Sequence, residues 1–354
     1  MLPRPTGVYS ETYAETLAWL RTRGEWALFI LLVTVPFLVP WVAPKYLGTF
    51  VVIGISIVSV LGLYVTMGMA GQINLGQAAF MGVGAYTTAL AAKAGLPSVL
   101  ALIVSGASAG CFGLIFGLPA LRVKGFYLAI STLAAQVVFE SVVVRLPRGI
   151  FGGTLGLGVA PASILGIRLT SERDIYFLVV ATMLFLLYGT YNLGRSRVGR
   201  AFLSIREDDV VAPILGVNLF WYKSLAFVIG AFYAGMAGGL WAFYTRYVVA
   251  DQFTFFQSVW LVGMLIVGGV GSVKGAIVGP IVVRGIEQVV TIFGPQMSRW
   301  VPFVGSEVWY ALMHILLGFA ILLVVITEPR GLAHRIDILR TSYGIWPFPY
   351  LRRE

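Results

Sequence analysis

Residues 53–69 read IGISIVSVLGLYVTMGM, a run that contains no charged side chain. Residues 310–326 read YALMHILLGFAILLVVI and also lack Asp, Glu, Lys and Arg. Runs of this length can form helices that cross about 30 Å of hydrocarbon. A spanning segment must satisfy its own backbone hydrogen bonds, so only helices or a closed barrel can cross. Barrel strands alternate apolar and polar residues, whereas these runs are continuous, which predicts membrane-spanning helices.

The composition of the whole chain agrees with this prediction. Of its 354 residues, 58% are hydrophobic and 11% are charged, against about 25% charged residues in a soluble domain. The net charge of +10 comes from bases spread between the apolar runs. That pattern is typical of positive charge kept on cytoplasmic loops. We therefore expect an integral membrane protein in contact with the lipid bilayer, with no nucleic-acid partner.

The predicted fold is an all-α integral membrane protein with about ten transmembrane helices. The third span is rich in Gly and Ala, so we expect it to be broken or partly re-entrant. Spans two to five start outside and spans seven to ten start inside, which is the pattern of inverted four-helix repeats in transporters. The predicted spans are 26–43, 50–70, 73–92, 98–120, 125–144, 174–193, 221–245, 256–272, 275–293 and 307–326.

The distribution of lysine and arginine favours a cytoplasmic location for both termini. With ten spans, sixteen of the 25 bases fall on the same side as the termini, and cytoplasmic loops carry the excess of such bases. The predicted organisation is a cytoplasmic N-terminal segment at 1–25, a transmembrane domain at 26–326 and a cytoplasmic tail at 327–354. Within the domain, a periplasmic loop spans 145–173 and a cytoplasmic loop spans 194–220.

Motifs for ATP hydrolysis and for catalysis are missing from the sequence. Residues 268–275 read GGVGSVKG, but a phosphate-binding loop needs Lys followed by Ser or Thr, so we expect a tight turn there. His314 and His334 have no Cys or carboxylate at ligand spacing, which argues against a metal site. No arrangement of residues suggests catalysis. We therefore predict a non-enzyme without a metal or other cofactor.

Two ionisable residues fall inside the ninth predicted span. Arg284 and Glu287 are three residues apart, so they share a helix face and can pair. Ionisable groups within spans are costly and often functional. A secondary carrier or channel that works without an ATPase therefore stays open beside a structural ion pair.

The cytoplasmic loop holds the most informative segment, GRAFLSIREDDVVAPILGVN at residues 199–218. Ser204 and Glu207 have the spacing of a capping box, acids favour the first turn of a helix, and Gly216 suits a helix end. The pattern predicts a short cytoplasmic helix. Its apolar residues Val211, Ile214 and Leu215 would form a docking surface or would lie on the lipid interface.

This segment resembles the coupling loop of ABC importer permeases, and its wording is closest to the branched-chain amino-acid permeases of the LivM type. Pro213 departs from the pattern, since proline removes a backbone hydrogen bond inside a helix. The resemblance covers roughly residues 50–330. Four further stretches carry it in order, namely AGQINLGQAAFMGVGAY at 70–86, LRVKGFYLAISTLA at 121–134, GGTLGL at 152–157 and GGVGS at 268–272.

The resemblance implies a five-part importer in the bacterial inner membrane. The partners would be a second permease of the LivH type, two ATP-binding subunits that supply ATP hydrolysis, and a periplasmic substrate-binding protein. The implied substrate is a branched-chain amino acid or a similar small solute, with urea, amides and aromatic acids as alternatives. A membrane scaffold without a solute path is a further alternative.

Two groups of residues are the candidate sites. In thin, glycine-rich spans, polar side chains are natural contacts for a solute, although hydrogen bonding between helices is an equal alternative for Gln72 and Asn74. The candidates for the substrate path are Gln72, Asn74, Gln77, Ser131, Thr132 and Gln136. The candidates for coupling to the ATPase are Arg200, Arg206, Glu207, Asp208, Asp209, Ala212, Leu215 and Gly216.

Overall fold

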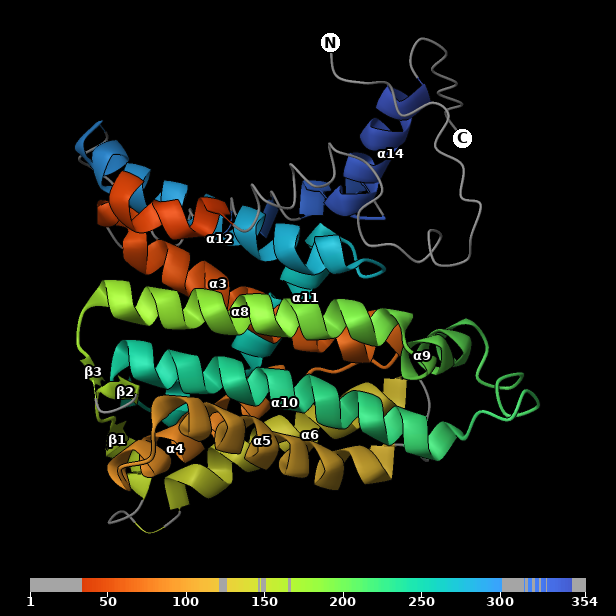
Figure 1. Ribbon diagram of the computed structural model, residues 1–354, viewed down its shortest axis with the longest axis horizontal. Helices are drawn as coiled ribbons and strands as arrows, with labels where there is room; N and C mark the ends of the chain where they lie inside the picture. The colour runs from red at the N-terminus through yellow and green to blue at the C-terminus, as the bar shows by residue number, and fades with distance from the viewer. Residues whose placement is uncertain are drawn as a thin grey trace.

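The helices of the protein run roughly along the long axis of the molecule in the computed structural model (Figure 1). Short strands lie at one end of this axis, which we call the strand end. Helix α9 lies at the other, which we call the α9 end. The structure describes residues 34–120, 126–145, 147, 151–164, 167–300, 315, 318–319, 322–324, 326–328 and 330–345.

Several predictions fall outside these residues. They are the N-terminal segment 1–25, the start of the span at 26–43, and much of the span at 307–326, which includes His314. The stretch at 121–125, which opens one of the resemblance motifs, is also outside.

Most of the described chain is helical, which confirms an all-α membrane protein. Among the described residues, six helices are long and apolar enough to cross a membrane, and the predicted number of ten is not confirmed. They run through Pro44–Met69, Ser98–Gly117, Tyr127–Arg145, Glu172–Arg195, Leu219–Thr245 and Ala250–Gly268.

The described helices follow the order of the predicted spans, with short 3-10 turns between some of them. The turns are η1 (Pro44–Tyr46), η3 (Gly153–Leu155) and η4 (Ala250–Gln252), and η2 (Tyr64–Met69) is a π-helix that continues α3. The α-helices are α3 (Leu47–Leu63), α4 (Gln77–Lys93), α5 (Ser98–Ala120), α6 (Phe126–Arg145), α8 (Glu172–Arg195), α9 (Arg197–Glu207), α10 (Leu219–Thr245), α11 (Phe255–Gly268), α12 (Val273–Trp300) and α14 (Leu332–Ile345).

Short strands cap the strand end, within and beside the loop predicted at 145–173. Strand β1 (Leu157–Gly158) pairs antiparallel with β4 (Tyr247–Val248). Strands β2 (Ala162–Ile164) and β3 (Ile167–Leu169) form an antiparallel hairpin. The sequence carries no signal of these strands, because two or three residues are too few to show the alternation that marks a strand.

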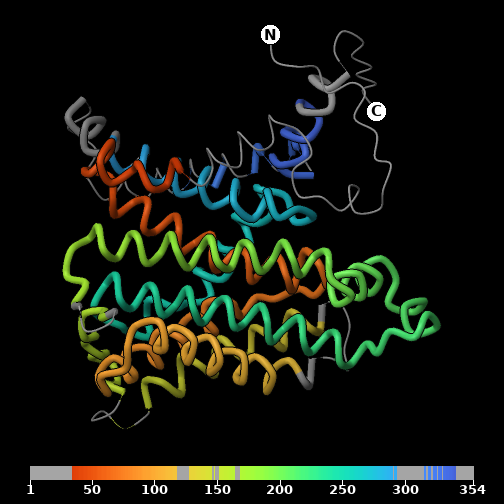
Figure 2. The backbone as a smooth tube through the Cα atoms, in the orientation of Figure 1, coloured from red at the N-terminus to blue at the C-terminus, as the bar shows by residue number. Residues whose placement is uncertain are grey.

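The core lies around α10, which packs against α3, α4 and α5 and is seen as the green-blue tube at the centre of Figure 2. Glycines allow the closest approaches. A methyl group at Gly84 of α4 would overlap the backbone of Gly235 in α10, and one at Gly238 would overlap the carbonyl oxygen of Met81. Small residues at a helix contact let backbones approach closely, which is the usual packing of membrane helices.

Helices α4 and α11 are short beside α10 and α12, and α11 is long enough to cross a membrane only together with the turn η4 before it, over Ala250–Gly268. Helix α4 has 17 residues and α11 has 14, which correspond to about 25 Å and 21 Å at 1.5 Å per residue. An irregular segment precedes each one, at 70–76 and at 246–254. The third predicted span is therefore broken, as expected. The eighth predicted span, 256–272, agrees with α11 at its start, but the helix ends four residues earlier, at Gly268.

Candidate functional site

The break in the third span begins where the π-helix η2 ends. Ala70 donates its N–H to the carbonyl of Val65, five residues back, and Gln72 donates to Thr66. Gly71 follows with a φ of +66°, a conformation that glycine adopts without steric cost. The chain then returns toward the middle of α3, and α4 starts beside Ser59.

A buried cluster of polar side chains holds the start of α4. The Gln77 amide donates to the carbonyl of Ser59 at 2.8 Å, and Asn74 Nδ2 donates to Gln77 Oε1 at 3.0 Å. Asn74 Oδ1 accepts the N–H of Gly76 at 2.9 Å. These bonds satisfy backbone and side-chain groups at a helix start that would otherwise lack partners inside the protein.

Helix α6 supplies the second side of this cluster. Thr132 Oγ1 accepts the N–H of Leu75 at 3.0 Å. Gln136, one turn further along α6, donates its amide to the carbonyl of Phe253, just before α11. Thus α6 contacts the irregular segments before both short helices.

Ser258 of α11 connects the two short helices directly. Its hydroxyl accepts the N–H of Ala78 in α4 at 2.9 Å and donates to Gln136 Oε1 at 3.3 Å. The starts of α4 and α11 therefore meet inside the protein. We call this cluster the polar junction. Its members all have an exposed fraction of 0%, and they are Ser59, Asn74, Gln77, Thr132, Gln136 and Ser258.

Four of the six predicted path residues belong to the polar junction. In this conformation they bond to the protein itself. Gln72 lies outside the junction, is 3% exposed, and has no hydrogen-bond partner for either side-chain amide atom. Ser131 is half-buried and lies on a different face of α6 from Thr132 and Gln136. Ser59 and Ser258 were missed, because a serine in an apolar helix carries no sequence signal of its long-range partner.

The predicted coupling helix is shifted in the structure. We predicted a helix that starts at Ser204, but Ser204 and Glu207 lie in the last turns of α9, which starts after its N-cap Ser196. The extended backbone of Asp208 (φ −155°) ends α9. The capping-box prediction is therefore wrong, because Ser196 accepts the N–H of Gly199 at 3.1 Å and starts the helix about two turns earlier.

A compact turn follows α9 instead of a helix. Asp208 Oδ1 accepts the N–H groups of Val210 and Val211 at 2.8 and 3.2 Å. At the far end, Gly216 has a φ of +83° and donates to Pro213, while Val217 donates to Ala212. These two bonds form the Schellman pattern and close the turn at Gly216, where the sequence predicted the end of a helix. The irregular turn also accommodates Pro213.

The turn exposes apolar side chains at the α9 end. Val211, Ile214 and Leu215 are 44%, 80% and 72% exposed, whereas Ala212 is buried. We call these three exposed residues the apolar tip. Asp209 pairs with Lys223 of α10 at 3.2 Å, which ties the turn to the helix bundle. Glu207 and Arg200 are exposed, and Arg200 donates to the carbonyl of Arg195.

Arg206 joins α9 to the break in the third span. Its Nη1 donates to the carbonyl of Gly68 at 2.6 Å, at the end of the π-helix. A methyl group at Gly71 would meet the Cγ of Arg206 at 3.2 Å, and one at Gly271 would meet its guanidinium at 3.8 Å. Arg206 thus lies between the apolar tip and the segment that leads to the polar junction.

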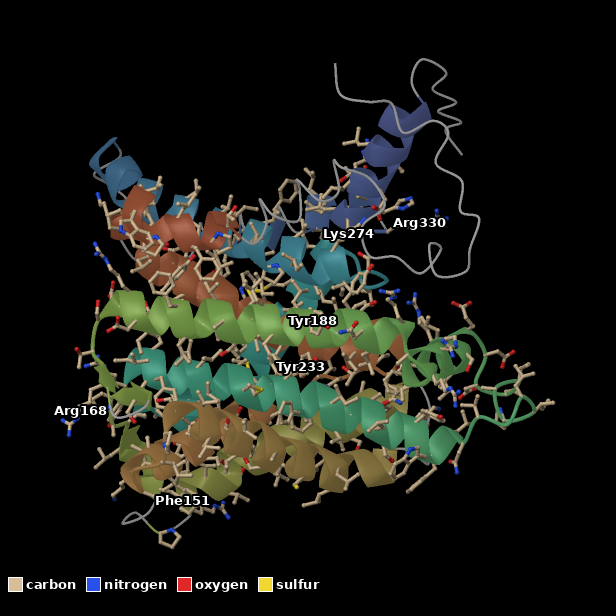
Figure 3. The ribbon with its side chains drawn as sticks, viewed as in Figure 1. Phe151, Arg168, Tyr188, Tyr233, Lys274 and Arg330 are labelled. Atoms are coloured by element: carbon tan, nitrogen blue, oxygen red, sulfur yellow. The ribbon has the colours of Figure 1, made fainter. Side chains whose placement is uncertain are left out.

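Residues 268–272 form the tight turn that was predicted between two helices. Gly269 has a φ of +113°, and Ser272 Oγ accepts the N–H of Gly275 at 3.0 Å. Lys274 then pairs with Asp337 of α14. Figure 3 shows Lys274 and Arg330 near this helix. Among the described residues, no group of three His, Cys, Asp or Glu side chains is placed to hold a metal ion.

Known proteins are similar in sequence to most of this chain. A family model described as the permease component of branched-chain amino acid transport systems matches residues 46–325. The high-affinity branched-chain amino acid transport system permease protein LivM of Escherichia coli (strain K12) is 28% identical over 334 residues, which cover 86% of this chain and 73% of that protein. No solved structure matches the chain.

Two further relatives differ in type and in source. The probable branched-chain amino acid transport permease protein LivM of Methanocaldococcus jannaschii is 26% identical over 245 residues, which cover 66% of this chain and 67% of that protein. The high-affinity branched-chain amino acid transport system permease protein LivH of Escherichia coli (strain K12) is 28% identical over 214 residues, or 58% of this chain and 67% of that protein.

Proposed function

Because the chain belongs to the family of permease components of branched-chain amino acid transport systems, we propose that it is the LivM-type permease subunit of an ATP-driven importer for branched-chain amino acids. The observation that carries the proposal is the family match over residues 46–325, on a fold that ends in an exposed apolar tip. The chain is a transport component rather than an enzyme. A related solute such as urea, an amide or an aromatic acid is the alternative substrate.

We propose that the apolar tip docks on an ATP-binding subunit. Val211, Ile214 and Leu215 project from the end of the bundle, and apolar side chains exposed in this way mark interaction surfaces. Arg206 supports the proposal, since it leads from the docked segment to the broken third span. A displacement of α9 by the ATP-binding subunit would then also displace residues 70–76. The predicted coupling residues Glu207, Asp208 and Asp209 flank the tip and give it an acidic border.

The docking proposal implies an orientation in the bacterial inner membrane. The α9 end would face the cytoplasm together with both termini, the loop at 194–220 and the tail at 327–354. The strand end, with Arg168 exposed on it (Figure 3), would face the periplasm and receive the substrate-binding protein. The remaining partners would be a LivH-type permease and a second ATP-binding subunit.

We propose that the two halves of the transmembrane domain are inverted repeats within a ten-span fold. The packing supports this, because each long central helix contacts the short helix of the other half. Helix α10 packs against α4, and α3 packs against α11. Each short helix also follows an irregular segment, and the two helices start at the same polar junction. Discontinuous helices of this kind form binding sites in many transporters.

The solute path, on this proposal, runs past the polar junction. In the described conformation the junction is closed by its own hydrogen bonds, so it would open when the starts of α4 and α11 separate. Gln72 has an unpaired amide already. Gln72 would thus be able to bind the solute without such a change, and the path residues of the polar junction would bind it only after the junction opens.

Purification from the native host tests the proposed function. The tagged chain should bring with it a second permease and two ATP-binding subunits, and the complex in proteoliposomes should import leucine only with ATP. A chain that purifies alone and still transports would establish a secondary carrier or channel. A deletion strain with normal uptake of amino acids would favour a membrane scaffold.

A further inference from the structure

Three aromatic side chains separate the polar junction from the strand end. Phe139 of α6 lies between Tyr86 of α4 and Phe253, which precedes α11. The ring centroid of Phe139 lies 6.3 Å from that of Tyr86 and 6.4 Å from that of Phe253, and both contacts are edge-to-face. Each of the three residues is only 2% or 3% exposed. We call them the aromatic seal.

The aromatic seal lies directly against the polar junction, on the side of the strand end. Phe139 follows Gln136 by three residues in α6, and the Gln136 amide donates to the carbonyl of Phe253. Beyond Phe139, α6 continues toward the loop that carries β1 and β2. Helix α4 runs the same way, from the junction to contacts with β1 and β4. A solute that enters at the strand end between these helices would therefore meet the seal before the junction.

A glycine lets the Phe139 ring close the gap between α4 and α6. A methyl group at Gly82 of α4 would lie 2.1 Å from Cζ of Phe139, so any side chain there would displace the ring. The end of the ring thus rests on the α4 backbone. A small displacement of α6 from α4, or a rotamer change at Phe139, would break this contact.

The Tyr86 hydroxyl has no hydrogen-bond partner while the seal is closed. It lies close to Ala250 and Asp251 of η4, and Asp251 is exposed at the strand end. A buried hydroxyl without a partner is costly, and such a group calls for an explanation in a native structure. A partner that arrives in another conformation provides one. The unpaired hydroxyl lies on the line from the surface to the junction, where a solute would pass.

We infer that the aromatic seal is the outer gate of the solute path, and that Tyr86 contacts the solute in that gate. The gate opens when Phe139 leaves Gly82, which connects the strand end to the polar junction. The rings offer apolar surface to the side chain of an apolar amino acid, and the Tyr86 hydroxyl offers a hydrogen bond to its head group. The inference rests on the proposed function, since it assumes that the solute enters at the strand end.

Cysteine accessibility tests the gate, and the chain suits this method because Cys111 is its only cysteine. In a Cys111→Ala background, Ser258→Cys places a thiol at the polar junction of the assembled importer, in right-side-out membrane vesicles. A membrane-impermeant thiosulfonate added outside should react slowly with it. Phe139→Ala should raise the reaction rate about tenfold or more, because local opening no longer has to break the ring contacts.

Phe80→Ala is the matched control for the loss of a buried ring. Phe80 also lies in α4 and is fully buried, but its ring packs against Phe112 of α5, on the other side of α4 from Gly82. The reaction rate should therefore stay at that of the parent. Phe139→Leu is the milder variant, used if Phe139→Ala does not assemble, and should also raise the rate. Phe139 variants that react no faster than Phe80→Ala would overturn the inference.

Tyr86→Phe tests the solute contact separately. The variant keeps the ring and removes an unpaired hydroxyl, so the midpoint of thermal unfolding should not fall. Leucine import at a limiting concentration of leucine-loaded binding protein should fall about fivefold, because a hydrogen bond to the solute is lost. Tyr233→Phe removes a hydroxyl that is bonded to Thr190 and to the Leu186 carbonyl, and should lower the midpoint without this effect on import. Unchanged import by Tyr86→Phe would overturn the assignment of Tyr86.

The outcomes separate this inference from the proposed function. A wild-type complex that does not import leucine would contradict the proposed function, whereas the labelling of Ser258→Cys requires no leucine. A wild-type complex that imports leucine, with Phe139 variants that react no faster than Phe80→Ala, would contradict the inference alone. Faster reaction of the Phe139 variants in inverted vesicles only would contradict both the inference and the proposed orientation, since the strand end would then face the cytoplasm.

Discussion

The hydroxyl of Ser258 in α11 accepts the backbone N–H of Ala78 in α4 at 2.9 Å, although 180 residues separate the two in sequence. Both residues lie in the first turn of a short helix. The N–H of Ala78 is one of the first in α4, so it has no hydrogen-bond partner within that helix. A side chain of one short helix thus provides the hydrogen-bond partner that the start of the other lacks. The Ser258 hydroxyl also donates to Gln136, so it connects three helices at the polar junction.

Removal of that hydroxyl should destabilise the permease. Ser258→Ala leaves the buried Ala78 N–H and Gln136 Oε1 without a partner, which costs about 1–3 kcal/mol. We expect a lower midpoint of thermal unfolding in detergent. Ser224→Ala is the matched control, since Ser224 is buried but bonds only to the Phe220 carbonyl within its own helix. Equal shifts for the two variants would contradict the role of Ser258.

Arg206→Ala should separate ATP hydrolysis from transport. The variant loses a charge-assisted bond to the Gly68 carbonyl, which contributes about 1.5–3 kcal/mol, while the apolar tip stays in place. In proteoliposomes the leucine imported per ATP hydrolysed should fall about tenfold. Arg197→Ala, an exposed arginine in the first turn of the same helix, should leave this ratio unchanged. An unchanged ratio in Arg206→Ala would exclude Arg206 as the link.

The apolar tip should be required for assembly with the ATP-binding subunits. Ile214→Glu together with Leu215→Glu places two charges in the proposed contact, where each apolar side chain would contribute about 1.5–3 kcal/mol when buried. The ATP-binding subunits should no longer copurify with the chain. Leu155→Glu, at the strand end and 77% exposed, is the control and should leave their copurification intact. Retention of the subunits by the double variant would place the contact elsewhere.

The glycine contact between α4 and α10 should tolerate no side chain. Gly238→Ala forces a methyl group against the Met81 carbonyl, and overpacking of this kind typically costs about 1–3 kcal/mol. Gly263→Ala adds the same methyl group to α11, where no atom lies within 4 Å. We expect loss of thermal stability for the first variant and none for the second. Similar stability would mean that the two helices can move apart freely.

The sequence predicted the features that depend on local pattern. Apolar runs located the helices, glycine content predicted the break in the third span, and Gly216 was recognised as an end, although of a turn rather than of a helix. The spacing of Arg284 and Glu287 predicted their pairing, which the structure confirms at 2.8 Å. Each of these signals lies within a few residues, where the physical cause acts directly on the chain.

The features that were missed depend on contacts between distant residues. The contact of Ser258 in α11 with Ala78 and Gln136 is one of them, and an apolar run shows no sign of such bonds. The coupling helix was placed too late because Ser196 and Ser204 both precede helix-compatible residues. The extended backbone at Asp208 decided between them. The β1–β4 pair joins Leu157 to Val248, and no short motif announces such a pairing.

The broken third span also has a consequence for biosynthesis. Residues 70–76 leave the regular helix inside the protein, where backbone groups that face lipid would be costly. Their partners are Thr132 in α6 and, through Ala78, Ser258 in α11. A ribosome makes those helices later, so the segment cannot reach its final position when it first leaves the insertion machinery. It must wait until α11 has been synthesised, or stay shielded by water or by another protein until then.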